Sequence, residues 1–129
     1  MRGPMTRVLV VDDSADMRES LRRLLAVEGF DAEAARDGQQ ALEVQRRRPA
    51  AVLITDIYMP RSDGIETIAA FRREFPRTKI IAMSGGGRVV KGAYLALAGA
   101  LGADATLQKP FEFAALMQVF ARLEVARPS

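Results

Sequence analysis

The chain has 129 residues, the size of one ordinary domain, and its 49% hydrophobic and 27% charged composition argues against disorder and coiled coil. Cysteine, histidine and tryptophan are absent, which excludes zinc fingers, thiolate or serine–histidine catalysis, and histidine-bound haem. The 19 lysines and arginines outnumber the 16 acidic residues by three, but they lie in short dispersed groups, which favours solvated helix faces over nucleic-acid binding.

Short apolar or β-branched runs alternate along the chain with segments of helical spacing. In chain order, strands are predicted at residues 7–12, 30–35, 51–56, 79–84 and 104–108. The first, third and fourth runs are continuously apolar, which is typical of strands covered on both faces. The second run alternates and is rich in alanine, which indicates an edge strand.

Apolar residues at helical spacing fill the intervals between these runs. They extend from Met17 to Leu25, from Ala41 to Val44, from Ile65 to Phe75, from Tyr94 to Leu101 and from Phe113 to Leu123. Asp13 or Ser14 is expected to cap the first helix and Gly29 to close it, and Pro76 ends the third. Strand and helix therefore alternate five times, an order that requires parallel neighbours with right-handed crossovers.

This alternation predicts the fold class and the domain organisation. We expect an α/β fold that is doubly wound, a flavodoxin-like (βα)5 arrangement with a parallel five-stranded sheet of order 2-1-3-4-5. The domain is expected to span residues 6–126, with tails at residues 1–5 and 127–129.

Polar side chains stand where four of these strands end. They are Asp12 and Asp13, Asp56, Ser84 and Lys109. Because ligands of open parallel sheets bind beyond the carboxyl ends of the strands, these residues are expected to converge. Three bare carboxylates would repel one another, and a hard divalent cation such as Mg²⁺ would relieve this.

Each of these residues taken singly has a structural explanation. Asp13 fits a helix cap, Ser84 fits a turn before three glycines, and a lone Lys109 fits the surface. A buried carboxylate at Asp56 is harder to explain, because burial without a partner costs several kcal/mol. The joint placement of all five at four strand ends favours a functional site.

Four segments resemble the receiver domain of two-component response regulators, of the kind found in chemotaxis regulators. They are VLVVDDS (residues 8–14), LITDIYMPRSDG (53–64), AMSGG (82–86) and KPF (109–111), and the resemblance covers nearly the whole chain. It implies that Asp56 is the phosphoacceptor aspartate. It also implies that Asp12, Asp13 and Asp56 hold Mg²⁺ together with the backbone carbonyl of Tyr58.

The same resemblance assigns the remaining site residues. Ser84 corresponds to the hydroxyl residue that binds the phosphoryl group, Lys109 to the family's lysine, and Lys109-Pro110 to its cis peptide bond. Ser84 and Thr106 stand at the switch positions. Because Thr106 replaces the aromatic residue of many receivers, the signal is expected to travel instead through the loop at residues 84–88 and the fourth helix.

The resemblance further implies the partners of the chain. With no histidine of its own, the chain would receive its phosphoryl group from a histidine kinase or a histidine phosphotransfer protein. It would signal by contact with a downstream protein or a second copy, through the face formed by the fourth helix, fifth strand and fifth helix. Ala93, Ala96 and Ala100 of the fourth helix, with Ala115 and Val119 of the fifth, are expected to contribute to that face. Beyond its own phosphorylation and dephosphorylation, no enzymatic activity is expected.

Other readings of the same residues lead to different functions. A haloacid-dehalogenase-type phosphohydrolase also uses an aspartate nucleophile, but its D-x-D motif needs a second aspartate where this chain has Tyr58. A flavodoxin-like flavin carrier would need a Ser-, Thr- and Gly-rich loop in place of Asp12-Asp13. A receiver fold kept only as a binding module would not need the complete acidic set. Short tails favour a stand-alone receiver over a fragment of a larger regulator or hybrid kinase.

The apolar segments are too short for a membrane protein. The first run, Val8 to Val11, is followed at once by two aspartates, and the longest uncharged stretch, Gly92 to Ala103, is much shorter than a membrane span. We therefore expect a cytoplasmic protein without a membrane partner.

Overall fold

The computed structural model describes residues 5–57, 64–84, 96 and 98–126. Within them, five strands form one parallel sheet of order β2-β1-β3-β4-β5, which confirms the predicted topology. The strands are β1 (Arg7–Val11), β2 (Asp31–Ala35), β3 (Val52–Asp56), β4 (Lys79–Ser84) and β5 (Ala105–Gln108). The helices are α1 (Ala15–Val27), α2 (Gly38–Arg47), α3 (Gly64–Glu74) and α5 (Phe113–Arg122). Of the predicted fourth helix, residues 96 and 98–100 are described and helical, and the rest lies outside the described residues.

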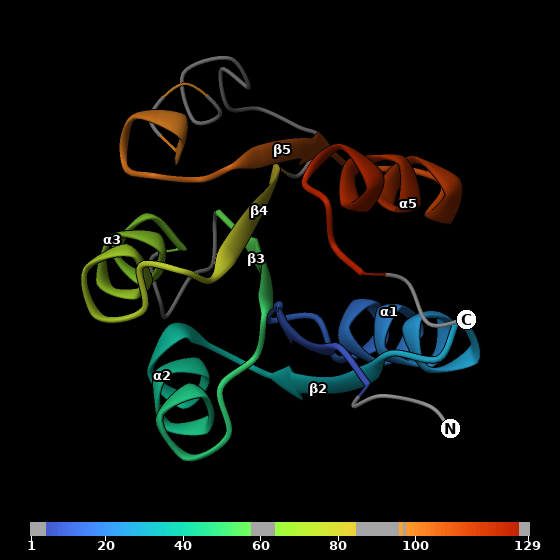
Figure 1. Cartoon of the computed structure of the whole chain (residues 1–129), viewed down its shortest axis with the longest axis horizontal. Helices are drawn as coiled ribbons and strands as arrows, with labels where there is room; N and C mark the ends of the chain where they lie inside the picture. The colour runs from blue at the N-terminus through green and yellow to red at the C-terminus, as the bar shows by residue number, and fades with distance from the viewer. Residues whose placement is uncertain (1–4, 58–63, 85–95, 97, 127–129) are drawn as a thin grey trace.

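The helices cover both faces of the sheet (Figure 1). Helices α1 and α5 lie on one face, and α2 and α3 lie on the other. Successive residues of a strand point to opposite faces, so Val8 and Val10 pack towards α1 and α5 while Leu9 and Val11 pack on the α2 side. The sheet thus separates two cores, and β2 lies at an edge as its alternating pattern predicted.

Helix α1 begins and ends at residues that the sequence predicted as caps. The Ser14 hydroxyl accepts a hydrogen bond from the Met17 N–H at 3.3 Å, so Ser14 rather than Asp13 is the N-cap. At the other end Gly29 adopts a φ of 95°, and the Phe30 N–H donates to the Leu25 carbonyl. Glycine is the residue that reaches this left-handed conformation without strain, and it ends the helix here.

No helix in the described part of the chain combines the length and apolar character needed to cross a membrane.

Candidate functional site

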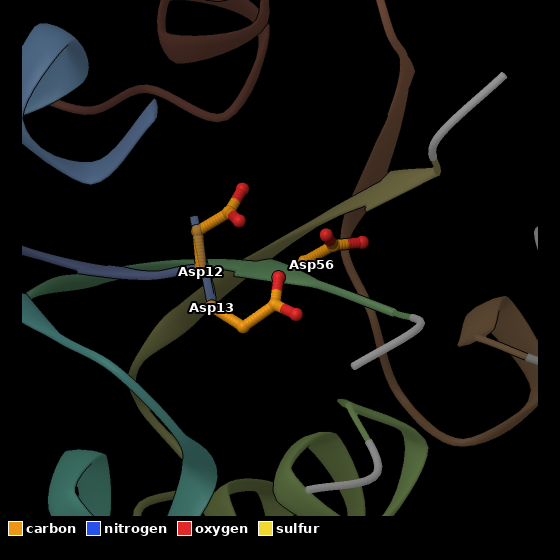
Figure 2. A group of neighbouring side chains, drawn as sticks. All are labelled: Asp12, Asp13 and Asp56. Carbon is orange, nitrogen blue, oxygen red and sulfur yellow. The ribbon is translucent and has the colours of Figure 1, made fainter. Parts of the chain in front are cut away.

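Three carboxylates meet at the carboxyl edge of the sheet (Figure 2). Asp12 and Asp13 follow β1, and Asp56 is the last residue of the neighbouring strand β3. One carboxylate oxygen of each lies within 4.8 Å of the other two. Asp12 and Asp56 are buried, whereas Asp13 is exposed. The predicted convergence of the acidic residues is therefore present.

Lys109 joins two of these carboxylates. Its Nζ atom donates to Oδ2 of Asp12 at 2.7 Å and to Oδ2 of Asp56 at 3.1 Å. Burial lowers the pKa of the Lys109 amine, but the hydrogen bond to Asp12 and the charge of Asp56 outweigh it and raise this pKa overall. The lysine is accordingly held as a cation between two anions.

The segment after β5 aims Lys109 into the site. The Lys109 N–H donates to the Ser84 carbonyl at 2.7 Å, and the Lys109–Pro110 peptide bond is cis, as predicted. Ser84 is itself buried as the last residue of β4. Ser84 at the end of β4 and Lys109, which directly follows β5, thus lie next to each other at the same edge as the carboxylates.

The turn between β1 and α1 is fixed by hydrogen bonds to the acidic pair. The Ser14 N–H donates to Oδ1 of Asp12 at 2.9 Å. Nη1 of Arg18 donates to the main-chain carbonyl of Asp12 at 2.9 Å and lies 3.4 Å from that of Asp13. Sequence reasoning did not identify Arg18, because an arginine in the second turn of a helix ordinarily extends into solvent.

The start of α3 packs directly on the end of β3. A Cβ atom at Gly64 would lie 2.6 Å from the Ile57 Cα atom and closer still to the Asp56 carbonyl oxygen. The Gly64 N–H donates to the Ile57 carbonyl at 3.0 Å. This close approach of two main chains, which a side chain would prevent, fixes the position of Asp56.

Several residues of the predicted site lie outside the part of the chain that the structure describes. Tyr58, whose carbonyl was expected to be a metal ligand, is outside the described residues, as are residues 85–88 of the expected loop. Thr106 is half-buried in β5, opposite Ala82 of β4.

One prediction for the signalling face is wrong. Val119 was expected to contribute to the surface of α5, but it is 1% exposed and packs in the core shared with α1. It follows Leu116 by three residues, the spacing at which one face of a helix is buried. Ala96 and Ala100 are exposed, as expected, and Ala93 lies outside the described residues.

The donor set at this edge fits a hard divalent cation. Carboxylate oxygens are the ligands that Mg²⁺ prefers, and one or two of them usually suffice while water and phosphate oxygens complete the shell. Three such oxygens lie close together here, with an exposed carboxylate on one side. The edge therefore combines a buried carboxylate at the end of β3, an acidic set suited to Mg²⁺ and the Lys109 cation.

Comparison with known proteins identifies related sequences. The model of the response regulator receiver domain matches residues 8–121. The chain is 41% identical over 119 residues to the response regulator MprA of Mycobacterium leprae (strain TN), covering 91% of this chain and 49% of that protein. It is 40% identical over 119 residues to MprA of Mycobacterium avium (strain 104), with 91% and 49% covered. The chain thus spans about half the length of the curated relatives it matches.

Two solved structures match this chain over nearly the whole length of both chains. The receiver domain of NtrX from Brucella abortus matches with a TM-score of 0.84 and 29% identity, covering 92% of this chain and 99% of that one. Chemotaxis protein CheY4 of Vibrio cholerae matches with a TM-score of 0.82 and 30% identity, covering 92% and 98%. The flavodoxin-like fold predicted from the sequence is therefore confirmed.

Proposed function

The chain belongs to the response regulator receiver domain family, and we propose that it accepts a phosphoryl group on Asp56 in two-component signalling. The observation that carries this proposal is the Asp56 carboxylate, buried at a strand end beside two further carboxylates and the Lys109 ammonium. A carboxylate can attack phosphorus, and phosphoryl transfer depends mainly on positioning and charge neutralisation, which this set supplies without histidine.

The acidic residues divide into a nucleophile and a metal-binding set. An oxygen of Asp56 would form the new bond to phosphorus while the bond between phosphorus and the donor atom breaks, giving an aspartyl phosphate. The electron pair of the broken bond stays on the donor, which is a histidine nitrogen of a partner protein or, for acetyl phosphate, an oxygen of the released acetate. Asp13 and Asp56, with the Tyr58 carbonyl, would hold Mg²⁺, and Asp12 would orient its water shell. When bound, the cation supplies positive charge that balances the phosphoryl oxygens.

Lys109 and Ser84 would act on the phosphoryl group from the other strands. The Lys109 ammonium would exchange a carboxylate oxygen for a phosphoryl oxygen and neutralise its charge. The buried Ser84 hydroxyl would donate a hydrogen bond to the phosphoryl group. Because the small Thr106 side chain fills little space, we infer that the response travels chiefly through the segment after Ser84 and the fourth helix.

The partners follow from the chemistry of the donor. A histidine kinase or a histidine phosphotransfer protein would supply the phosphoryl group, since the chain has no histidine. A downstream protein or a second copy would contact the face that includes β5, α5 and the exposed Ala96 and Ala100.

A phosphorylation assay tests this function directly. The protein is incubated with acetyl phosphate and Mg²⁺, and incorporation is measured by intact mass and by mapping the modified peptide. Asp56→Asn should abolish incorporation, because an amide is not a nucleophile towards phosphorus. Asp16→Asn, which changes an exposed aspartate in the first turn of α1, is the matched control and should incorporate normally.

Two outcomes would contradict the proposal. One is stable incorporation into Asp56→Asn, and the other is incorporation by the unchanged protein that a chelator of divalent cations does not reduce.

A further inference from the structure

The turn that carries Asp12 and Asp13 is closed by a ring of hydrogen bonds. The Asp12 carboxylate accepts from the Ser14 N–H at 2.9 Å, and the Ser14 carbonyl accepts from the Arg18 N–H at 3.0 Å. The Arg18 guanidinium then returns to the Asp12 carbonyl at 2.9 Å. The Arg18 side chain on α1 thus completes a closed set of hydrogen bonds that includes the Asp12 carboxylate of the site.

We propose that Arg18 is a positioning residue that holds the main chain of this turn so that the carboxylates of Asp12 and Asp13 face Asp56. The inference rests on the proposed function, because its consequence is tighter binding of Mg²⁺. The main-chain carbonyls of Asp12 and Asp13 follow the last residue of β1, so they need other partners than the strand ladder. Nη1 of Arg18 is within hydrogen-bond distance of both, and it ties the turn to the rigid helix that follows.

Two effects of Arg18 on a bound cation oppose each other. Its positive charge close to the acidic cluster repels Mg²⁺, so charge alone would make the arginine weaken binding. Its hydrogen bonds to the turn fix the ligands before the cation arrives, so positioning would make it strengthen binding. The sign of the change on removing the side chain therefore separates positioning from charge.

The experiment measures Mg²⁺ affinity by calorimetric titration, without any phosphodonor. Arg18→Met removes the donors and the charge, and we expect affinity to fall about tenfold, the low end of the range for residues that orient metal ligands. Arg18→Lys keeps the charge and an ammonium group that donates hydrogen bonds, and it should restore most of the loss. Arg22→Met is the matched control: it removes an arginine one turn further along α1, where its partner is Glu19, and affinity should not change.

A second measurement distinguishes positioning from general damage to the structure. Incorporation from acetyl phosphate is followed as Mg²⁺ is raised. In Arg18→Met the half-saturating Mg²⁺ concentration should rise about tenfold while the rate at saturation stays near that of the unchanged protein. A lower rate at saturating Mg²⁺, or Arg18→Met binding Mg²⁺ as tightly as the unchanged protein or more tightly, would overturn the inference. If the unchanged protein itself neither binds Mg²⁺ nor incorporates phosphate, the proposed function fails instead.

Discussion

The two ends of the parallel strands differ in how their charged groups are paired. We call the side of the sheet where the strands begin the amino edge, and the side where they end, which holds the candidate site, the carboxyl edge. At the amino edge, Arg7 at the start of β1 donates to Asp31 and Glu33 of β2, at 3.0 and 2.8 Å. Arg72 near the end of α3 donates to Asp104 at 2.8 Å, and the same carboxylate oxygen accepts from the Ile80 N–H of β4. Each of these cations is paired with at least one carboxylate. In the described residues, the Arg7 Nε atom is the only buried side-chain polar atom without a hydrogen-bond partner.

Among the residues that the structure describes, the charges at the carboxyl edge are not balanced. Three carboxylates lie around the single ammonium group of Lys109, and two of them are buried. Proteins tolerate such local conflict chiefly at functional sites, because the rest of the structure supplies the stability. The comparison indicates that the amino edge stabilises the fold and the carboxyl edge keeps a charge imbalance for a ligand, so substitutions at the two edges should affect different properties.

The largest loss of stability is expected at the carboxyl edge, from a steric rather than an electrostatic cause. Gly64→Ala places a Cβ atom against the main chain of Asp56 and Ile57, and we expect the free energy of unfolding to fall by about 3 kcal/mol. Urea unfolding measures this. Gly99→Ala is the matched control, because its Cβ atom meets nothing within 4 Å and the residue is helical, so stability should stay equal or rise. An equal change in the free energy of unfolding at both glycines would show that the close approach of the two main chains does not cause the loss of stability.

The next effect tests the amino edge. Gln45 is buried; its Oε1 accepts from the Ala50 N–H at 2.9 Å, and its Nε2 donates to the Ala50 carbonyl and to Oγ1 of Thr78. Gln45→Leu leaves a buried N–H without an acceptor, which should lower the free energy of unfolding by about 2 kcal/mol. Mg²⁺ binding and incorporation on Asp56 should not change. Gln118→Leu on the exposed side of α5 is the control for the substitution itself.

A loss of Mg²⁺ affinity in Gln45→Leu, measured on the folded protein, would contradict the separation of the two edges.

A smaller effect is expected from Lys109, the cation that bonds to the site carboxylates in the described part of the chain. Lys109→Met leaves the carboxylates of Asp12 and Asp56 without their shared partner, and we expect a loss of about 1 kcal/mol without Mg²⁺, because the lysine is partly exposed. Mg²⁺ affinity should rise, since the ammonium no longer competes with the cation for the carboxylates of Asp12 and Asp56. Added Mg²⁺ should therefore raise the unfolding temperature of Lys109→Met more than that of the unchanged protein. Lys79→Met, an exposed lysine at the amino edge, should change neither property.

This expectation is opposite in sign to that for Arg18→Met, although both substitutions remove one positive charge. Weaker Mg²⁺ binding in Lys109→Met would show that the lysine orients the carboxylates rather than competing for them.

Much of this arrangement could be predicted from the sequence. Continuous apolar runs identified the central strands, and the rule that the carboxyl ends of parallel strands meet at one edge brought Asp12, Asp13 and Asp56 together. The interactions of long side chains could not be predicted in this way. Spacing places Arg18 and Gln45 on their helices, but it does not show that one reaches back to a turn and the other bonds a following loop. The error at Val119 was avoidable, because its spacing from Leu116 and Phe120 already indicates a buried position.

The smallest effect concerns an exposed ion pair at the amino edge. Arg46 at the end of α2 donates to both carboxylate oxygens of Glu74 on α3, at 2.8 and 2.7 Å. This hydrogen bonding lowers the pKa of the Glu74 carboxyl group below its ordinary value. A lowered pKa means that the pair stabilises the fold fully above the ordinary glutamate pKa and that this contribution is lost as the pH falls through the lowered value.

Glu74→Gln should therefore lower the unfolding temperature slightly at neutral pH, and the difference from the unchanged protein should disappear in acid. About 1 M salt should also reduce the difference, because at that concentration the screening length between exposed charges falls to about 3 Å. A double-mutant cycle with Arg46→Gln isolates the pair from other effects of each substitution. A difference that persists in acid and in salt would mean that Glu74 stabilises the amino edge by packing, and the matching of charges would then not explain the stability of that edge.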